Sequence, residues 1–448
     1  MVIGAGAAGL MAACAAADQG AQVLVLEHNE KAGKKIFITG KGRCNYTNAC
    51  ETEDFFASVV RNPKFLYSAV YGFDSSAVTA FLEENGCRTK EERGKRCFPQ
   101  SDHAFDVTDA LVRHLTRHHG KIRFHADVVQ ILTKTGEEAL PEPAGKAESR
   151  KTVCGVKLRS GEVIRADAVI AATGGMSYPS TGSTGDGYRF AQDLGLNVKS
   201  PAPSLVPFAV AESWPVELQG LSLKNVAVRL EELEPYQEVP AGRKKKKKRP
   251  VYEGFGEMLF THFGVSGPLV LTASCHADFA KHPEGYRLHL DLKPQVTREE
   301  FAGRLAREFS LYPRRELRTA LKAFLPERLA GIAAQLFAAS EENPSAEGGA
   351  DRAVYTLNEK ELLELAGFLK DLTMTVTGTR GFAEAIVTRG GVSVSEINPS
   401  TMETRSIRGL YWAGEVLDVD AYTGGFNLQI AWSTGHLAGE CAAEESQA

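Results

Sequence analysis

The sequence predicts an α/β fold in which a domain of parallel strands and helices is interrupted by a β-rich and then a helical insertion. Met1–Ile3 and Val23–Leu26 are short apolar runs typical of buried strands, and the alanine-rich segment Leu10–Gln19 between them is typical of a helix. Residues 196–297 contain alternating segments rich in Val and Leu, which indicate short antiparallel strands. Residues 298–372 contain amphipathic patterns with the period of a helix.

The composition is that of an ordinary globular protein. Hydrophobic residues make up 43% and charged residues 24% of the 448 residues, and the formal net charge is −4. This balance makes neither a nucleic acid nor a membrane the default partner. The eight cysteines are scattered and form no C-x-x-C pair, which favours reduced thiols over disulfides or a metal site. No apolar run reaches about 18 residues, so we expect a cytoplasmic protein with no membrane contact.

A glycine pattern connects the first strand to the first helix. Gly4, Gly6 and Gly9 form G-x-G-x-x-G, in which the first glycine allows a tight turn, the second lets a diphosphate approach the backbone, and the third allows close packing. The diphosphate would lie at the helix N-terminus, where free N–H groups and the helix dipole favour an anion. Glu27, at the end of the second strand, is placed to bind ribose hydroxyls. The pattern predicts dinucleotide binding, and a glycine-rich turn in an unrelated α/β protein is the alternative.

The C-terminal region contains a second strand and helix with a glycine-rich turn. Leu410–Ala413 is predicted to be a strand that ends in Gly414–Glu415, and Asn427–Leu437 to be a helix. Glu415 could hydrogen-bond a ribityl hydroxyl, and the helix would direct its N-terminus, near Gly424–Phe426, at the polar N1/O2 edge of a flavin. A strand and helix that only complete the sheet are the alternative.

The middle of the first domain supplies another strand end. Ala168–Ala172 is predicted to be a buried strand that runs into Thr173–Gly175, where small residues would leave room for a cofactor. It follows a hairpin with its turn at Arg159–Gly161. Before the hairpin, residues 122–131 alternate as one strand would, and main-chain groups near Val128 could meet an adenine.

These segments together resemble a known family. The stretches VIGAGAAGLMAA, GKKIFITGKGRCNYTN, ATGG…TGSTGDGY, FTHFGVSGP and GLYWAGEVLDVDAYTGGFNLQIAWSTG resemble the two-dinucleotide-binding-motif FAD flavoproteins, and more narrowly the bacterial BaiN-type flavoproteins. The resemblance implies non-covalent FAD in a Rossmann-like domain with two insertions, one β-barrel-like and one small and helical. The expected domains are residues 1–195 and 375–448 for FAD, 196–297 for the β-rich insertion and 298–374 for the helical insertion.

The residues expected to bind the cofactor come from all of these segments. They are Gly4, Gly6, Ala8, Gly9, Glu27, Lys35, Gly40, Arg43, Cys44, Asn45, Val128, Thr173, Gly174, Gly414, Glu415, Gly425, Phe426, Asn427 and Leu428.

The segment Gly33–Asn48 is rich in glycine and cations and is expected to fold back over the diphosphate. Arg43 suits a bidentate contact with a phosphate or stabilisation of a reduced flavin. Asn45 can donate hydrogen bonds to cofactor oxygens or cap a turn. Cys44 would need to be a thiolate for a redox or nucleophilic role, which the neighbouring cations favour, but a packed neutral thiol is the simpler interpretation.

Three residues are candidates for catalysis: His262, Cys44 and Arg43. His262, between glycines in FTHFGVSGP, could give a proton to the substrate when a hydride leaves the flavin. A structural turn with a hydrogen-bonded histidine is the alternative.

The run GRKKKKKRP at residues 242–250 is the strongest cluster of charge. It could be a solvated hairpin tip, or Lys244, Lys245, Lys246, Lys247 and Lys248 could contact the phosphates of ribosomal RNA. An RNA contact is relevant because the resemblance includes reduction of a uracil base in ribosomal RNA as one activity.

These observations predict an FAD-dependent oxidoreductase. The expected reaction is hydride transfer from reduced flavin to a conjugated C=C bond, either of a small molecule or of a uracil base in ribosomal RNA, with NADH or NADPH as a transient electron donor. An oxidase of small amines and a non-catalytic, flavin-containing RNA-binding protein are the alternatives.

Overall fold

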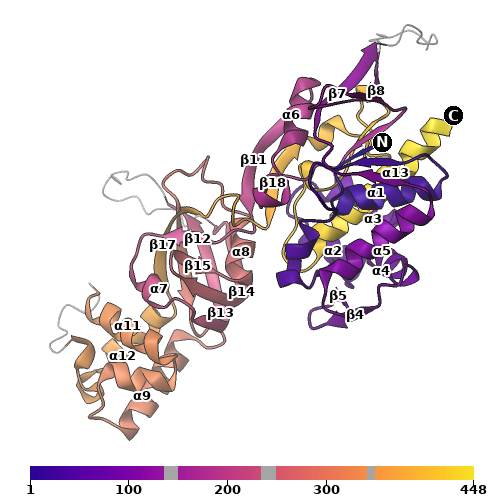
Figure 1. The fold of residues 1–448 in the computed structure, drawn as a ribbon. Helices are drawn as coiled ribbons and strands as arrows, with labels where there is room; N and C mark the ends of the chain where they lie inside the picture. The colour runs from indigo at the N-terminus through magenta and orange to yellow at the C-terminus, as the bar shows by residue number, and fades with distance from the viewer. Residues whose placement is uncertain (136–149, 234–248, 341–348, 448) are drawn as a thin grey trace. The chain divides into compact units, whose positions relative to one another are not determined.

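Figure 1 shows the computed structural model of the chain, which describes residues 1–135, 150–233, 249–340 and 349–447. The chain divides into two compact units. Unit 1 consists of Met1–Ser204 and Gly381–Ala448, and unit 2 consists of Leu205–Arg380. Among the described residues, no helix combines the length and the apolar character that a membrane span requires.

The centre of unit 1 is a five-stranded parallel sheet with the order β20-β10-β1-β2-β6. The strands are β1 (Val2–Ile3), β2 (Leu24–Leu26), β6 (Lys121–Arg123), β10 (Val169–Ala171) and β20 (Leu410–Trp412). From β1 the chain continues outward to β2 and β6, and then returns to the other side of β1 to form β10. The strand order therefore reverses between β1 and β10, which is the topological switch point where open α/β sheets bind ligands.

Two helices of unit 1 pack with their backbones in contact. Helix α1 (Ala7–Asp18) is buried over nearly its whole length, and it lies beside α13 (Phe426–Gln447) (Figure 1). A Cβ on Gly435 would lie 2.4 Å from the Ala8 oxygen, and a Cβ on Gly439 would lie 2.3 Å from the Ala12 oxygen. Only glycine permits this approach, which brings the two ends of the chain together.

Smaller sheets surround this centre. One contains β7 (Val128–Thr135), β8 (Lys151–Leu158), β9 (Val163–Arg165) and β19 (Ile407–Arg408). Another contains β3 (Thr47–Asn48), β4 (Thr89–Glu92) and β5 (Arg96–Pro99), and a third pairs β11 (Val198–Ser204) with β18 (Val387–Val392). The remaining helices of unit 1 are α2 (Thr52–Ser58), α3 (Tyr67–Gly72), α4 (Ser75–Glu84), α5 (Ala104–Arg117) and α6 (Asp186–Asp193), with the 3-10 helices η1 (Ile36–Gly42), η2 (Pro63–Leu66), η3 (Pro179–Thr181), η7 (Val394–Glu396) and η8 (Gly414–Val416).

The expectation of one strand over residues 122–131 is wrong. The segment forms two strands, of which β6 pairs with the parallel sheet and β7 pairs with β8. His125, between them, has φ +53°, so the backbone turns there and passes from one sheet to the other. The alternating pattern continues through the turn because each strand buries its own apolar side chains.

Unit 2 contains a closed barrel with the order β12-β15-β14-β13-β16-β17. The strands are β12 (Phe208–Val210), β13 (Ser222–Glu232), β14 (Tyr252–Thr261), β15 (Gly264–Ser266), β16 (Tyr286–Asp291) and β17 (Leu372–Thr379). Inward-facing residues alternate along each strand, as Tyr286, Leu288 and Leu290 do in β16. The expected β-barrel-like insertion is therefore confirmed. The domain boundaries remain predictions, and the one at residue 375 lies within β17.

Helices complete unit 2. They are α7 (Trp214–Glu217), α8 (Pro268–Ser274), α9 (Arg298–Leu311), α10 (Leu317–Ala320), α11 (Glu327–Ala338) and α12 (Glu359–Leu369), with η4 (Leu321–Ala323), η5 (Gly349–Asp351) and η6 (Val354–Thr356). The residues of α8 were expected to be a strand. Gly267, at φ +94°, turns the chain, and Pro268 then occupies the first helical position, where it favours a helix.

Candidate active site

The glycine turn lies at the switch point of the parallel sheet. Gly4 has φ +99°, and a Cβ there would lie 2.6 Å from the Ala172 oxygen at the end of β10. A Cβ on Gly9 would lie 1.9 Å from the Gly4 oxygen. Gly6 differs, because no atom lies within 4 Å of a Cβ built on it. Two of the three glycines are therefore required by packing, and the third borders open space where a ligand can approach.

The N-terminus of α1 is available for an anion. Gly6 is the N-cap, and within the described part of the chain no side chain accepts a hydrogen bond from the first turn of the helix. The helix is 12 residues long, so its first N–H groups and its dipole provide a positive end beside the open space at Gly6. Ala8, in this turn, is in close contact with Gly414, since a Cβ on Gly414 would lie 2.6 Å from the Ala8 Cβ.

Glu27 is held in one orientation at the end of β2. Its Oε2 accepts a hydrogen bond from the Ala5 N–H at 2.7 Å, and its Oε1 accepts from the Asn29 N–H at 2.8 Å. The residue is only 6% exposed. Oε1 also accepts a second hydrogen bond, from Asn29 Nδ2 at 2.8 Å, so both of its lone pairs are used. Oε2 accepts one hydrogen bond from the described residues and keeps a lone pair with which it can bind a ribose hydroxyl. Sequence reasoning did not identify Asn29, because a polar residue after a strand gives no distinctive signal.

Two buried oxygens near the switch point lack partners. Thr173 Oγ1, after β10, and Asn45 Oδ1, after η1, have no hydrogen-bond partner among the described residues. Buried polar atoms are nearly always hydrogen-bonded, so each of these oxygens indicates a ligand or water partner. Gly174, next to Thr173, has φ +73°. Both residues were predicted to bind the cofactor.

Four of the five residues from Gly40 to Cys44, in the loop after β2, have left-handed backbone conformations. Gly40, Lys41, Gly42 and Cys44 have φ between +57° and +87°. Lysine and cysteine rarely adopt such values, which cost about 1–3 kcal/mol each. Strain of this size persists where the surroundings fix the conformation, and such positions are concentrated at functional sites.

Lys35 and Glu415, which were both predicted to bind the cofactor, form an ion pair with each other. Lys35 Nζ donates to Glu415 Oε2 and to Ser177 Oγ, both at 2.6 Å, and Ser177 Oγ donates to Glu415 Oε1 at 2.6 Å. The Thr388 N–H also donates to Glu415 Oε1, at 2.8 Å. The network ties the loop after β2, the loop after β10 and β18 to η8. Thr388 escaped sequence reasoning because only the three-dimensional packing places it beside Glu415.

Arg43 is also paired within the chain. Its guanidinium forms a bidentate contact with Glu92 and donates from Nε to Asp102 at 2.8 Å, and it lies 4.2 Å from the centre of the Phe98 ring. These acids raise the pKa of Arg43, and Arg43 lowers the pKa of Glu92. Its predicted role as a ligand for phosphate or flavin stays a prediction, and such a role would have to compete with both carboxylates.

Cys44 is completely buried. Burial raises the pKa of its thiol to about 12, so the side chain is neutral at physiological pH. This agrees with a packed thiol near the site. Any part that Cys44 takes in the reaction would be that of a neutral thiol.

The N-terminus of α13 packs tightly on the loop before it. Gly425 has φ +102°, and a Cβ there would lie 2.4 Å from the Thr47 oxygen. Asn427 uses its side-chain amide within the chain, since Oδ1 accepts from the Ala421 N–H at 2.9 Å and Nδ2 donates to the Ala421 oxygen at 2.8 Å. Phe426 is buried against Phe55, with ring centres 6.0 Å apart. Leu428, the next residue but one, is half-buried.

The roles of two further predicted site residues, Val128 and His262, stay predictions. Val128 is buried at the start of β7, where it pairs with Leu158. His262 belongs to unit 2 and is exposed in the turn between β14 and β15, with its ring edge-on to Phe263 at 4.8 Å. Lys244, Lys245, Lys246, Lys247 and Lys248 lie outside the described residues.

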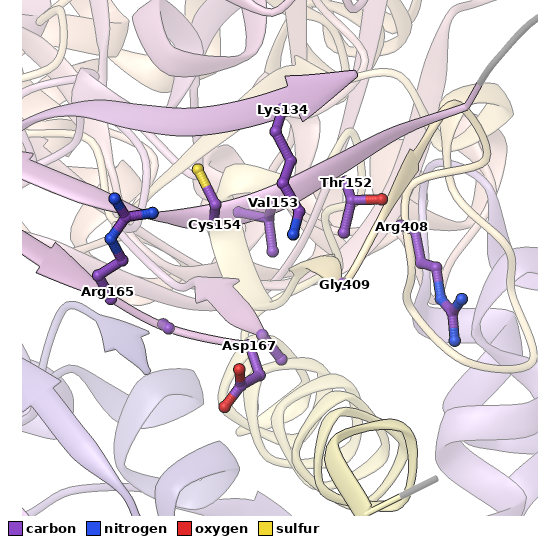
Figure 2. Close-up of a pocket in the computed structure, with 10 residues that line it drawn as sticks. Lys134, Thr152, Val153, Cys154, Arg165, Asp167, Arg408 and Gly409 are labelled. Carbon is purple, nitrogen blue, oxygen red and sulfur yellow. The ribbon is translucent and has the colours of Figure 1, made fainter. Parts of the chain in front are cut away.

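A pocket of about 300 Å³ lies at the other edge of the sheet. Figure 2 shows that Lys134, Arg165, Asp167 and Arg408 surround it. Ala168, which also lines it, precedes β10, so the pocket is at the amino ends of the parallel strands. Ligands of open α/β sheets bind outside the carboxyl ends, where Gly4 and Thr173 lie. This pocket is therefore separate from the candidate active site.

Comparison with known proteins identifies the family of the chain. The family model described as the HI0933-like protein Rossmann domain matches residues 1–441. The chain belongs to this family. The 3-dehydro-bile acid delta(4,6)-reductase of Clostridium scindens is 32% identical over 447 residues, which cover 99% of this chain and 98% of the relative. The ribosomal RNA dihydrouridine synthase of Escherichia coli is 30% identical over 437 residues, which cover 97% and 95%.

Among solved structures, the 3-ketosteroid-delta4-(5alpha)-dehydrogenase of Rhodococcus jostii RHA1 matches 99% of this chain and 96% of its own, with 15% identity and a TM-score of 0.48.

The protein is an FAD-dependent oxidoreductase, as the sequence predicts. FAD fits the residues present. The open space at Gly6 and the uncapped N-terminus of α1 suit a diphosphate, and the carboxylate of Glu27 suits ribose hydroxyls. The buried oxygens of Asn45 and Thr173 suit polar atoms of the cofactor.

Proposed function

We propose that the protein reduces a conjugated C=C bond and that its substrate is a uracil base in ribosomal RNA. A bound flavin supplies a hydride, which saturates such a bond once a proton is added at the neighbouring carbon. Two of the relatives are named for a reduction of this kind, one on a bile acid and one on ribosomal RNA. Their identities to this chain differ by too little to choose between the two substrate classes.

The observation that favours RNA is a basic hairpin tip beside the candidate site. Arg93 and Lys95, in the turn between β4 and β5, and Arg96, the first residue of β5, are exposed. No ion pair to an acidic side chain within the described residues involves any of the three. Exposed cations without acidic partners suit the phosphates of an RNA strand. Lys90 and Arg43, at the base of the same hairpin, are instead balanced by Glu92 and Asp102.

The hairpin tip is fixed close to the start of α13. The Ala49 N–H donates to the Lys95 oxygen at 2.8 Å. Asn48 Nδ2 donates to the Gly94 oxygen at 3.0 Å and to the Gly424 oxygen at 3.1 Å. One side chain therefore joins the cationic tip to the glycines before α13, so phosphates bound at the tip would lie near the cofactor site.

The finer assignments belong to the same proposal. His262 is the proposed proton donor, and its loss should slow substrate reduction by about 10²–10⁴-fold while leaving reduction of the flavin unchanged. NADH or NADPH is the proposed source of the hydride. We also propose that the protein acts in the cytoplasm, where ribosomal RNA is present.

The first test is anaerobic and uses the FAD-loaded protein. The flavin is reduced with NADPH or NADH in separate samples and then mixed with unmodified ribosomal RNA or with a 3-dehydro-Δ4,6 bile acid. Return of the flavin absorption with RNA alone, together with a gain of two hydrogen atoms in one uridine by mass spectrometry, is the expected result. Return with the bile acid alone would exclude RNA as the substrate and favour a small-molecule reductase.

A second test addresses the hairpin. In the variant R93Q/K95Q/R96Q, the slope of log affinity for RNA against log salt should fall by about 2, because each phosphate contact on a single strand contributes about 0.7. The matched control is K121Q/K151Q/K157Q, which also removes three positive charges from exposed positions of unit 1. Equal slopes in the two variants would show that the hairpin tip does not contact RNA.

A further inference from the structure

A histidine pair and an aspartate form a cluster far from the candidate active site. Asp18 ends α1, His114 lies in the last turn of α5, and His118 is the C-cap residue of α5. One ligand atom from each residue lies within 4.8 Å of the others. Because α1 begins at the glycine turn and is 12 residues long, Asp18 is about 18 Å from that turn. We propose that this cluster binds a divalent transition metal ion, such as Zn²⁺, that joins α1 to α5.

The orientation of the Asn85 side chain is fixed by its neighbours. Its Nδ2 donates to the Phe81 oxygen at 2.9 Å, and its Oδ1 accepts from Arg117 at 3.4 Å. A backbone oxygen can only accept and a guanidinium can only donate, so the two ends of the amide cannot be exchanged. His114 Nδ1 lies 3.1 Å from this Oδ1 and must therefore carry a hydrogen atom.

The other nitrogen of His114 faces the carboxylate. His114 Nε2 lies 2.7 Å from Asp18 Oδ1. With its hydrogen on Nδ1, a neutral imidazole presents a lone pair at Nε2, and the carboxylate oxygen also presents one. A cation, either a proton or a metal ion, must therefore lie between these atoms. A metal-bound histidine commonly donates its other N–H to an acceptor, as His114 does to Asn85.

His118 distinguishes a metal ion from a proton. Its Nδ1 lies 3.5 Å from the same Asp18 Oδ1, and its ring is stacked on the His114 ring with centres 4.6 Å apart. A proton between Asp18 and His114 joins only those two residues, whereas one divalent ion can accept all three donor atoms. Tetrahedral Zn²⁺, with bonds of about 2.0–2.1 Å, requires donor atoms about 3.3 Å apart, which small side-chain rotations would provide.

The setting suits a metal ion that is open to solvent. The Asp18 and His118 side chains are 40% and 43% exposed, so water can complete the coordination, while His114 is 15% exposed and held by the Phe81 ring at 4.8 Å. Two nitrogen ligands and one carboxylate favour Zn²⁺, Ni²⁺ or Cu²⁺ over Mg²⁺ or Ca²⁺. The two helices already pack here, since Cys14 Sγ of α1 lies 3.4 Å from the Leu111 oxygen of α5. A bound metal would stabilise this packing.

The test measures metal binding and does not depend on activity. The full chain, with FAD bound and treated with a chelator, is titrated with ZnCl₂ by calorimetry and with CoCl₂ by visible absorption. We expect one zinc site that is lost in D18N and weakened at least tenfold in H118Q. The melting temperature should rise by about 3–5 °C at a free zinc concentration 100 times the Kd.

The matched control is H119N, which removes the neighbouring exposed histidine and keeps a residue that tolerates its φ of +63°. It should bind zinc as the unaltered protein does. Equal zinc affinity in the unaltered chain, D18N and H118Q would overturn the proposal, because the zinc would then bind elsewhere, for example at cysteines. Absence of zinc binding by the unaltered chain would overturn it as well. H118Q keeps the contact between Asp18 and His114, so its fold should be unchanged. Its melting temperature without metal checks this.

Discussion

The replacement of Gly6 by alanine separates cofactor binding from folding. Gly6 has φ −79°, which alanine adopts freely, and no atom lies within 4 Å of the added Cβ. We therefore expect the FAD-free protein to be as stable as the unaltered chain, or more stable by about 0.4–1 kcal/mol, since alanine restricts the unfolded chain. The Cβ would, however, occupy the space through which a diphosphate approaches the backbone.

The loss of FAD affinity expected in G6A follows from the hydrogen bonds between main-chain N–H groups and the diphosphate. A hydrogen bond to a charged group contributes about 1.5–3 kcal/mol, so the loss of one N–H contact to the diphosphate weakens FAD binding by about 10- to 150-fold. Binding is measured by flavin fluorescence, and the stability of the FAD-free protein by circular dichroism during heating. If G6A binds FAD as tightly as the unaltered protein, the diphosphate does not approach Gly6, and the proposed cofactor position is wrong.

The matched control is G9A. Its Cβ would lie 1.9 Å from the Gly4 oxygen, so the turn or the helix has to move. Overpacking of this kind costs about 1–3 kcal/mol. G9A should therefore lose both stability and FAD affinity, whereas G6A should lose affinity alone. If both variants lose stability equally, the space at Gly6 is not open in solution.

Three further predictions concern single side chains. E415Q should lower the melting temperature, because Lys35 and Ser177 lose hydrogen bonds to a carboxylate that contribute about 1–3 kcal/mol. E30Q, which removes an exposed ion pair, should change the melting temperature little. Iodoacetamide at pH 8 should label the half-buried Cys50 before Cys44, whose pKa is raised to about 12. The order of labelling is measured by mass spectrometry, and labelling of Cys44 first would contradict the prediction. The pKa of Asp371 is lowered by its hydrogen bond from a histidine, so this carboxylate contributes stability that is present above about pH 4 and lost as the pH falls. D371N should therefore show a smaller drop in melting temperature on acidification than the unaltered chain.

The sequence was sufficient for the parts of the fold that depend on local patterns. The strand, glycine turn and helix around Gly4–Gly9 require particular residue types at fixed spacing. The structure has all three, and the helix begins at Ala7, three residues before the predicted start at Leu10. The alternating segments of the barrel and the amphipathic helices α9 and α12 were equally clear, since each buries one regular face. The turn at His125 was not predicted, because the pattern on either side of it continues unchanged.

The ion pairs of the site could not be predicted from the sequence, because their partners are far apart along the chain. Arg43 is paired with Glu92 and Asp102, which are 49 and 59 residues away, and Lys35 is paired with Glu415, which is 380 residues away. A cation beside glycines suggests a phosphate ligand, and only the folded chain shows which acids already neutralise it. The unpartnered oxygen of Asn45 was likewise visible only after the burial of its surroundings was known.

The distribution of charge in unit 1 separates two tasks. Lys35 and Arg43, two of the cations in the loop that the sequence places over the diphosphate, are neutralised by acids within the chain. The main-chain N–H groups and the dipole of α1 then supply most of the attraction for the diphosphate of a dinucleotide. The glycine turn fixes the position of these groups. The exposed cations at Arg93–Arg96 have no such acids beside them among the described residues, so they remain available to a second anion. A protein that held only a cofactor would have no need for this second group, which is why the hairpin tip favours a substrate with phosphates.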